Sequence, residues 1–255
     1  MREFNVEKTV NEIIEFIQDY YHKNHLKGGV IGLSGGKDSA VVLALFVKAL
    51  GSENVLSLWL PIHSSNEDYQ DVLALAKQFN VELKTHDLTN IYDSYANDIK
   101  KNNDVNNMNL LNANINIKPR LRMMTLYYYA AMYSSLKKKT YLVAGTSNKC
   151  ERYVGYFTKG GDNVSDINVL SNLTVSEVIK IGEYLGIPDN IIHKTPNDGL
   201  SGQSDEEKLG VKYSDIEKVL NHQNIDEDIK DKIDKLHKNN LHKFNIPEYQ
   251  VSKCD

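Results

Sequence analysis

The stretch GGVIGLSGGKDSAVVLALFVKALG, residues 28–51, joins a short apolar run to a helical pattern through a loop rich in glycine. The run at 28–33 predicts a buried strand, and the residues from Ser39 onward predict a helix that ends at Gly51. A strand that passes through a glycine loop into a helix is typical of α/β proteins with parallel strands. The stretch therefore indicates both a fold class and the place where a ligand would bind.

The rest of the chain repeats this alternation of strand and helix. The expected elements are a helix at 5–25, strands at 54–61, 81–88 and 140–146, helices at 67–79, 116–136 and 174–186, a short strand-like segment from Asp166, and two short helices within 213–239. This order predicts a doubly wound, mostly parallel five-stranded sheet with helices on both faces. We see no internal repeat and no linker, so residues 1–255 are expected to form a single domain.

Three finer expectations concern helix ends and loops. Pro119 suits the first turn of its helix, where a missing N–H costs nothing, and Gly186 suits a helix C-cap. The asparagine-rich stretch 97–116 shows little periodicity and is expected to be an exposed connection. Residues 147–165 are expected to form a long polar loop.

Composition and charge exclude several classes of protein. The chain of 255 residues is 41% hydrophobic and 25% charged, which is ordinary for a globular protein. Its net charge of −4 provides no global basic field that would recruit nucleic acid. The two cysteines, Cys150 and Cys254, do not suggest a disulfide framework. With no signal peptide and no membrane-length apolar run, the expected location is the cytoplasm.

The loop SGGKDS differs from the common phosphate-binding loop of nucleotide triphosphatases, G-x-x-x-x-G-K-[ST]. If Gly36 and Lys37 are aligned with that pattern, Ile31 replaces its first glycine and Asp38 replaces its hydroxyl residue. Two defining positions therefore fail, and an enzyme of that class is not expected.

The same loop still has what an anion site needs. Gly35 and Gly36 allow the backbone to approach a phosphate, Ser34 and Ser39 can donate hydrogen bonds, and a helix N-terminus points at the same place. Asp38 would repel a polyphosphate unless a divalent cation lay between them, so we interpret it as a Mg²⁺ ligand. The alternative is that Asp38 is a structural N-cap of the following helix.

The loop resembles the signature of the ATP pyrophosphatase superfamily, whose members cut ATP between its α and β phosphates. Four further stretches resemble the ammonia-dependent NAD synthetase family and follow in the family's order: NIKPRLRMMTLYY, GTSNKCERYVGYFTKGGD, PDNIIHKTPNDGLSGQSDEEKLGVKY and LHKF. The resemblance runs from the first helix to about residue 247, nearly the whole chain.

The resemblance implies a set of site residues. Matching positions imply ATP contacts at Gly32, Leu33, Ser34, Gly35, Gly36, Lys37, Asp38, Ser39, Thr146, Val175 and Asn197. Contacts to deamido-NAD are implied at Arg120, Lys159, Asp166, His242 and Lys243. The implied Mg²⁺ ligands are Asp38 and Glu151, and the implied catalytic residues are Asp38, Glu151 and Asp166. Without its neighbouring motif residues, Glu151 would be expected to be a solvated surface acid. The alternative role for Asp166 is structural capping.

The resemblance also implies a reaction in two steps. The nicotinate carboxylate of deamido-NAD attacks the α phosphate of ATP, and ammonia then displaces AMP from the adenylate to form the amide. We expect Asp166 to orient or deprotonate the incoming ammonium. Glutamine-using relatives carry an additional amidase domain, for which this chain has no spare segment, so the expected donor is free ammonia or a separate protein that delivers it. Family members are homodimers.

Three positions depart from the family's pattern. Lys37 stands where a small or apolar residue is usual, Val175 where a lysine approaches the phosphates, and Asn197 where a hydroxyl is common. We hypothesise that Lys37 supplies part of the charge lost at Val175. The alternative is that Lys37 faces solvent.

Two other functions remain open at this point. The chain could be another ATP pyrophosphatase with a different acceptor, or a nucleotide sensor without catalysis. Formation of an amide from deamido-NAD would distinguish the NAD synthetase reaction from that of another ATP pyrophosphatase. Steady release of pyrophosphate with deamido-NAD, ATP and ammonium would exclude a sensor without catalysis.

Overall fold

The computed structural model describes residues 4–103, 107–195 and 204–249. Its centre is a sheet of five parallel strands in the order β3-β2-β1-β4-β5. The strands are β1 (Gly28–Leu33), β2 (Val55–Trp59), β3 (Glu82–Thr85), β4 (Tyr141–Gly145) and β5 (Ile167–Asn168). The predicted fold class, a five-stranded doubly wound sheet, is confirmed.

The chain winds outward from β1 in both directions, and this places a switch point in the sheet. From β1 it continues to β2 and β3 on one side, and it later returns to build β4 and β5 on the other. Strand order therefore reverses between β1 and β4. In open α/β sheets the crevice beyond the carboxyl ends of the strands at such a point is where ligands bind.

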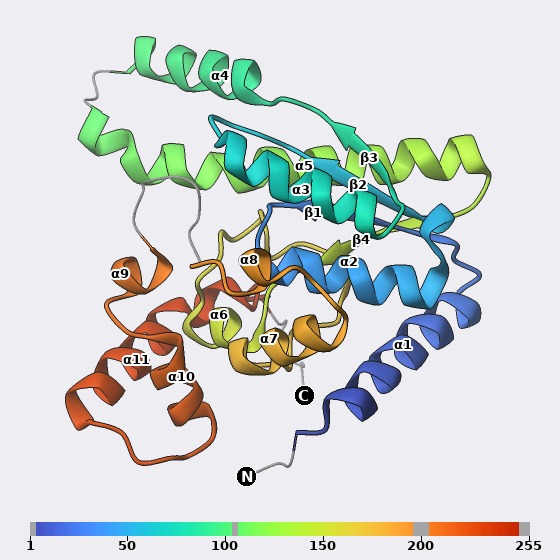
Figure 1. Cartoon of the computed structure of the whole chain (residues 1–255). Coiled ribbons are helices and arrows are strands. Elements are labelled where there is room, and N and C mark those ends of the chain that lie inside the picture. Colours follow the sequence, from blue (N-terminus) through green and yellow to red (C-terminus); the bar gives the residue numbers. More distant parts are fainter. Residues whose placement is uncertain (1–3, 104–106, 196–203, 250–255) are drawn as a thin grey trace, which may run out of the picture.

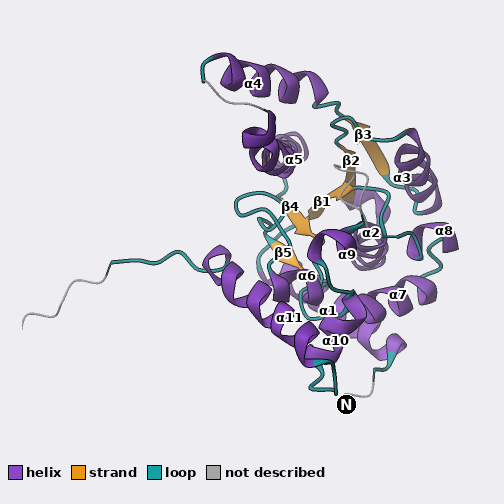
Figure 2. Ribbon diagram, turned by 90° about the vertical axis from the view of Figure 1, so that its left-hand side faces the viewer, coloured by secondary structure: helices purple, strands orange, loops and turns teal. Residues whose placement is uncertain are grey.

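Helices cover both faces of the sheet (Figures 1 and 2). One layer holds α1 (Val6–Lys23), α2 (Lys37–Leu50), α3 (Asn66–Gln78), α7 (Val175–Tyr184) and α8 (Asp189–Ile192). The other layer holds α4 (Thr89–Lys101) and the long α5 (Asn107–Lys137). Side chains alternate along β1, so that Ile31 packs in the first layer and Val30 packs against α5. This is why a continuous apolar run forms the central strand.

A third, smaller core joins the C-terminal helices to the edge of the sheet domain. It lies among α6 (Lys149–Val154), α7, α10 (Tyr213–Leu220) and α11 (Glu227–Asn240), around the buried Cys150, Tyr213 and Ile233. The short α9 (Asp205–Leu209) precedes α10, and the 3-10 turns η1 (Ser52–Asn54) and η2 (Leu241–Lys243) complete the elements. The helices expected within 213–239 are confirmed.

The expectation of an exposed connection at 97–116 is wrong. Helix α4 extends to Lys101, and α5 already begins at Asn107, so that Pro119 is inside α5 rather than in its first turn. The asparagine side chains find partners within the fold: Asn116 donates to the Asn112 carbonyl and accepts from the Thr158 hydroxyl. Low helix propensity is here outweighed by tertiary contacts.

Two smaller differences concern the loop after β4 and the length of β3. The expected polar loop 147–165 contains helix α6, and the strand expected at 81–88 is only Glu82–Thr85 long. The expected C-cap at Gly186 is displaced by one residue: α7 ends at Tyr184, its C-cap is Leu185, and Gly186 follows with a φ of 74° in the left-handed region. Among the described residues, no helix is long and apolar enough to span a membrane.

Candidate active site

A cavity of about 350 Å³ opens at the switch point, at the carboxyl ends of β1, β2 and β4. Its floor is the glycine loop, and its wall includes Thr146 and Glu151 after β4 and the face of α5 near Arg122. The cavity is lined by ten of the predicted site residues: Gly32, Leu33, Ser34, Gly35, Gly36, Lys37, Asp38, Ser39, Thr146 and Glu151. The structure therefore brings the loop after the first strand and the loop after the fourth strand into one site.

The glycine loop is held in shape by its own hydrogen bonds. Gly35 has a φ of 79°, and a Cβ atom there would lie 2.9 Å from the Asp68 carbonyl oxygen, so only glycine fits without strain. The Ser39 hydroxyl donates to the Gly36 carbonyl at 3.0 Å and accepts from the Ser34 N–H at 3.3 Å. Helix α2 begins at once after this turn, so its free N–H groups face the cavity and favour an anion.

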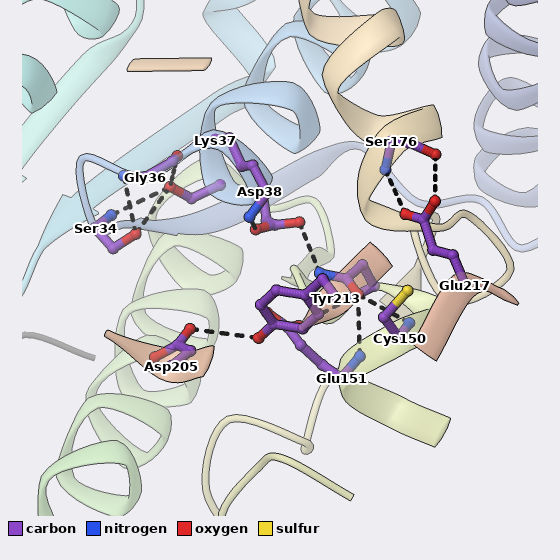
Figure 3. Close-up of polar contacts among 12 residues, drawn as sticks. Ser34, Gly36, Lys37, Asp38, Cys150, Glu151, Ser176, Asp205, Tyr213 and Glu217 are labelled. Atoms are coloured by element: carbon purple, nitrogen blue, oxygen red, sulfur yellow. Dashed lines mark hydrogen bonds and ion pairs between the residues drawn. The ribbon is translucent and has the colours of Figure 1, made fainter. Parts of the chain in front are cut away.

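Asp38 is not the cap of its helix. The N-cap of α2 is Gly36, and no side chain makes a capping hydrogen bond there. The Asp38 carboxylate instead accepts from the Lys37 ammonium at 2.9 Å and from the side-chain amide of Asn148 at 3.1 Å (Figure 3). The structural alternative for Asp38 is therefore wrong, and its carboxylate faces the second acid of the site.

Glu151 has a structural partner of its own. Asn148 and Glu151 form a capping box at the start of α6, in which the Glu151 carboxylate accepts from the Asn148 N–H at 3.1 Å. Burial, and then the nearby negative charge of Asp38, raise the pKa of the Glu151 carboxyl well above its usual range. Glu151 is therefore not a solvated surface acid, and a cation placed between it and Asp38 would relieve their repulsion.

The side chains of the site fit a magnesium ion whose coordination is completed by oxygen atoms of a bound nucleotide. Among the described residues, no group of three or more side chains of the metal-binding types could hold a metal alone. Asn148 contacts both acids, since its side-chain amide donates to the Asp38 carboxylate and its backbone N–H donates to the Glu151 carboxylate. Two carboxylates are what Mg²⁺ commonly takes from a protein when phosphate oxygens supply the rest.

Lys37 is buried in this site. Its side chain is only 5% exposed, so the alternative that it faces solvent is wrong. Burial alone would lower the pKa of its ammonium, but Asp38, Glu151 and Asp205 together raise it. Lys37 is therefore a fixed positive charge beside Asp38.

One predicted ATP-binding position among the described residues is not found in the cavity. Val175 does not line it, because its apolar side chain packs in the C-terminal core with Cys150 and Val154. Asn197 lies outside the described residues. The cavity thus lacks the family lysine at position 175, and Lys37 and Lys194 are basic residues that line it.

Four of the five residues predicted to contact deamido-NAD form a second group beside the cavity, called here the basic group: Arg120, Lys159, His242 and Lys243. The Arg120 guanidinium donates to the Lys159 carbonyl at 3.1 Å, and the Lys159 ammonium donates to the His242 carbonyl at 2.8 Å. The Lys243 ammonium donates to the carbonyls of Gly155 and Phe157 at 2.7 and 3.0 Å. Segments distant in sequence, from α5, the loop after α6 and η2, therefore converge here.

Asp166, the fifth of these residues, directly precedes β5 and shares no hydrogen bond with the basic group among the described contacts. Its carboxylate accepts from the Val143 N–H at 2.8 Å and from the Tyr127 hydroxyl at 3.2 Å. The aspartate thereby ties β4 to α5. Val143 itself lines the cavity, so Asp166 lies directly behind one of its walls.

Sequence reasoning missed several residues of the site. Asp205 is 7% exposed, lines the cavity and accepts from the Tyr156 hydroxyl at 3.1 Å. It also accepts from the Tyr213 hydroxyl at 3.4 Å (Figure 3). Lys194 also lines the cavity, and its ammonium contacts Asp68 and Asp71 of α3 at 2.9 and 2.7 Å.

Asn148, which donates to Asp38, was also missed, although the sequence carries a signal for it. The pattern Asn-x-x-Glu at 148–151 is a capping-box signature. Cys150, inside that box, is fully buried, and burial raises the pKa of its thiol to about 12. It is therefore not a nucleophile in this site.

The comparisons with known proteins agree with this geometry. The profile of the family described as NAD synthase matches residues 9–247. The chain belongs to the NAD synthase family. It is 41% identical to the "NH(3)-dependent NAD(+) synthetase" of Methanococcus aeolicus over 85% of this chain and 82% of that protein. The family resemblance predicted from the sequence is confirmed.

Solved structures of this family superimpose on nearly the whole chain. The NMN synthetase of Francisella tularensis is 34% identical with a TM-score of 0.87, and the two chains are covered to 97% and 99%. The NH3-dependent NAD synthetase of Campylobacter jejuni is 31% identical with a TM-score of 0.76, with 97% and 100% covered. This chain thus spans the full length of both structures and, like the family, is an amide-forming ligase.

Proposed function

We propose that this chain amidates deamido-NAD to NAD with ammonia, using ATP and releasing AMP and pyrophosphate. The observation that carries the proposal is the cavity, in which the glycine loop, Thr146 and two opposed acids, Asp38 and Glu151, meet at the switch point of an NAD synthase fold. A carboxylate is a poor electrophile, so amide formation needs an activating nucleotide, and this cavity offers the groups that a nucleotide requires.

The glycine loop would hold the phosphates of ATP. The N–H groups at the start of α2 and the hydroxyls of Ser34 and Ser39 can donate to phosphate oxygens. Asp38 and Glu151 would hold Mg²⁺, which, when bound, neutralises charge that develops on the departing pyrophosphate. Thr146, opposite the loop, would contact the same nucleotide. Catalysis then rests on positioning and charge stabilisation.

The basic group would hold the acceptor. Deamido-NAD carries a pyrophosphate and a nicotinate carboxylate, which cationic side chains bind well. Arg120, Lys159 and Lys243 donate to backbone carbonyls, and His242 lies among them. These side chains would exchange carbonyl partners for the anionic groups of the acceptor.

Asp166 would receive the nitrogen donor. Its carboxylate, bound to the Tyr127 hydroxyl and the Val143 N–H, can accept a further hydrogen bond from ammonium and take a proton as the amide forms. The rival role, a purely structural tie between β4 and α5, predicts that Asp166→Asn lowers stability without altering the dependence on ammonium.

We further propose a homodimer in the cytoplasm. The face of α5 that leaves Met124, Tyr128 and Leu136 between 56% and 70% exposed is a suitable contact for a second copy. Tyrosines of α5 lie on both sides of the helix, since Tyr133 is buried in the core while Tyr128 is exposed. In analytical ultracentrifugation we expect the parent chain to sediment as a dimer and the Tyr128→Glu variant to sediment as a monomer.

The test of the reaction is identification of the product by mass spectrometry. With deamido-NAD, ATP, Mg²⁺ and ¹⁵N-ammonium we expect ¹⁵N in the amide of NAD, with AMP and pyrophosphate formed in equal amounts. Amide-labelled glutamine in place of ammonium would give no labelled product. Hydrolysis of ATP without an amide would contradict the proposal.

A second acceptor is favoured by one observation. The NMN synthetase of Francisella tularensis superimposes with a TM-score of 0.87, against 0.76 for the NAD synthetase of Campylobacter jejuni. The corresponding substrate would be nicotinate mononucleotide, which carries the same carboxylate but no adenylate half. Comparing kcat/KM for the two acceptors decides between them, and a higher value for the mononucleotide would assign this chain to that activity.

A further inference from the structure

Lys37 introduces a cation where the metal site is expected. It is the first residue of α2, its side chain is 5% exposed, and its ammonium lies 2.9 Å from Asp38 Oδ2. The resemblance to the family implies a small or apolar residue at this position, where this chain has a charged one. The inference rests on the proposed function, because it takes Asp38 and Glu151 as the ligands of the metal.

The surroundings of Lys37 are acidic. The carboxylates of Asp38, Glu151 and Asp205 all line the cavity, and all three attract the Lys37 ammonium. Buried like charges repel one another strongly, and a fixed cation among them lowers that cost. Figure 3 shows Lys37 and Asp38 together on one side, with Asp205 and Glu151 on the other.

We propose that Lys37 is an internal counter-ion of the metal site, which competes with divalent cations for Asp38 until a nucleotide is bound. In the free protein its ammonium neutralises the Asp38 carboxylate, so that metal alone binds weakly. When phosphates enter the loop they accept hydrogen bonds from Lys37, whose long flexible side chain can turn toward them. Asp38 Oδ2 is then released to the metal, and metal and nucleotide bind together.

The proposal explains two departures from the family with one residue. A lysine at position 175 would reach the phosphates from α7, but Val175 is buried in the C-terminal core. In the proposal Lys37 contacts the phosphates from the glycine loop when nucleotide is bound, and its ammonium pairs with Asp38 when nucleotide is absent. Because binding linkage is reciprocal, nucleotide must strengthen metal binding as much as metal strengthens nucleotide binding.

The test measures metal binding without nucleotide and without turnover. Mn²⁺ is titrated into the free full-length chain, and free Mn²⁺ is followed by electron paramagnetic resonance, since carboxylates bind Mn²⁺ and Mg²⁺ alike. Lys37→Met removes the charge and keeps the length of an apolar side chain. We expect the Kd for Mn²⁺ to fall by on the order of tenfold or more, because a unit charge in contact with a ligand oxygen is lost.

Three further variants serve as controls. Lys37→Arg keeps the charge and should bind Mn²⁺ as weakly as the parent chain. Lys180→Met removes a charge from the exposed face of α7, far from the ammonium–carboxylate pair, and should leave the Kd unchanged. Adding Asp38→Asn to Lys37→Met should abolish the gain in affinity for Mn²⁺ that Lys37→Met produces. Thermal unfolding of each variant confirms that it is folded.

The outcomes are distinct. An equal Kd in the parent chain and in Lys37→Met overturns the inference, as does a gain that survives the loss of Asp38, since the metal would then bind elsewhere. Neither result removes the proposed reaction, which would fail if the parent chain, given deamido-NAD, ATP, Mg²⁺ and ammonium, hydrolysed ATP without forming the amide.

Discussion

The nucleotide cavity and the basic group beside it differ in how they are built. The cavity is shaped by short-range hydrogen bonds within one loop, between Ser34, Gly36 and Ser39. The basic group joins three distant segments, and its cations donate to backbone carbonyls. The first region is therefore organised without a ligand, whereas the second must exchange partners when it binds. We expect substitutions in the first to affect catalysis and stability, and those in the second to affect the KM of the acceptor.

The largest effect is expected for Asp38→Asn. The variant keeps the shape of the side chain but loses the charge that would hold Mg²⁺ between carboxylate and phosphate. We expect kcat for amide formation to fall by roughly 10²–10³, a loss typical of a stabilising group at a developing charge. Pyrophosphate release assays measure it, and an unchanged circular dichroism spectrum serves as the control for folding.

Gly35→Ala should damage the cavity through the backbone. The added Cβ would lie 2.9 Å from the Asp68 carbonyl oxygen, at a φ of 79° that alanine rarely adopts. We expect a loss of about 1–3 kcal/mol in the free energy of unfolding, together with a higher KM for ATP. Gly186→Ala is the matched control, because Gly186 has a similar φ of 74° but an added Cβ would meet nothing within 4 Å. Equal losses in both variants would show that only φ, and not the contact with α3, matters.

Arg120→Ala should affect binding of the acceptor and little else. Its guanidinium is exposed and contacts only the Lys159 carbonyl among the hydrogen bonds of the described residues. We expect the KM for deamido-NAD to rise about tenfold, as for the loss of one charge-assisted hydrogen bond, with the KM for ATP unchanged. A rise in the KM for ATP of similar size would show that the two regions are one site.

Tyr127→Phe should have the smallest effect. It removes one hydrogen bond, at 3.2 Å, from the Asp166 carboxylate, while the bond from the Val143 N–H remains. We expect the KM for ammonium to rise by about two- to fivefold, a net cost near 1 kcal/mol. The unfolding temperature separates the two roles of Asp166, since a purely structural tie would lower it and leave the KM for ammonium unchanged.

The parts of the site that could be predicted from the sequence are those held by local chemistry. The glycine loop follows its strand directly, so its conformation and its place at the sheet edge depend on neighbouring residues. Glu151 belongs to a box of four residues at 148–151. For the loop the pattern of residue types is sufficient, because the contacts that matter are a few residues apart. The box is equally local, but the metal-binding role of Glu151 was predicted from the family resemblance and not from this pattern.

The rest depends on contacts between distant segments. The asparagine-rich start of α5 is helical partly because Asn116 meets Thr158, and no local pattern reveals that contact. Asp205 reaches the cavity through Tyr156 and Tyr213, and Val175 is drawn into a core that only the C-terminal helices create. Lys37 could be read as a phosphate ligand or as a surface residue until its burial against Asp38 was known.

The chemistry at the cavity is tested most directly by following the oxygen atoms of the acceptor. With deamido-NAD whose nicotinate carboxylate is labelled with ¹⁸O, attack on the α phosphate transfers one labelled oxygen to AMP when ammonia displaces it. We expect one ¹⁸O atom in each AMP formed, and none in pyrophosphate. AMP without label, with NAD formed at the normal rate, would contradict activation of the carboxylate by adenylation in this site.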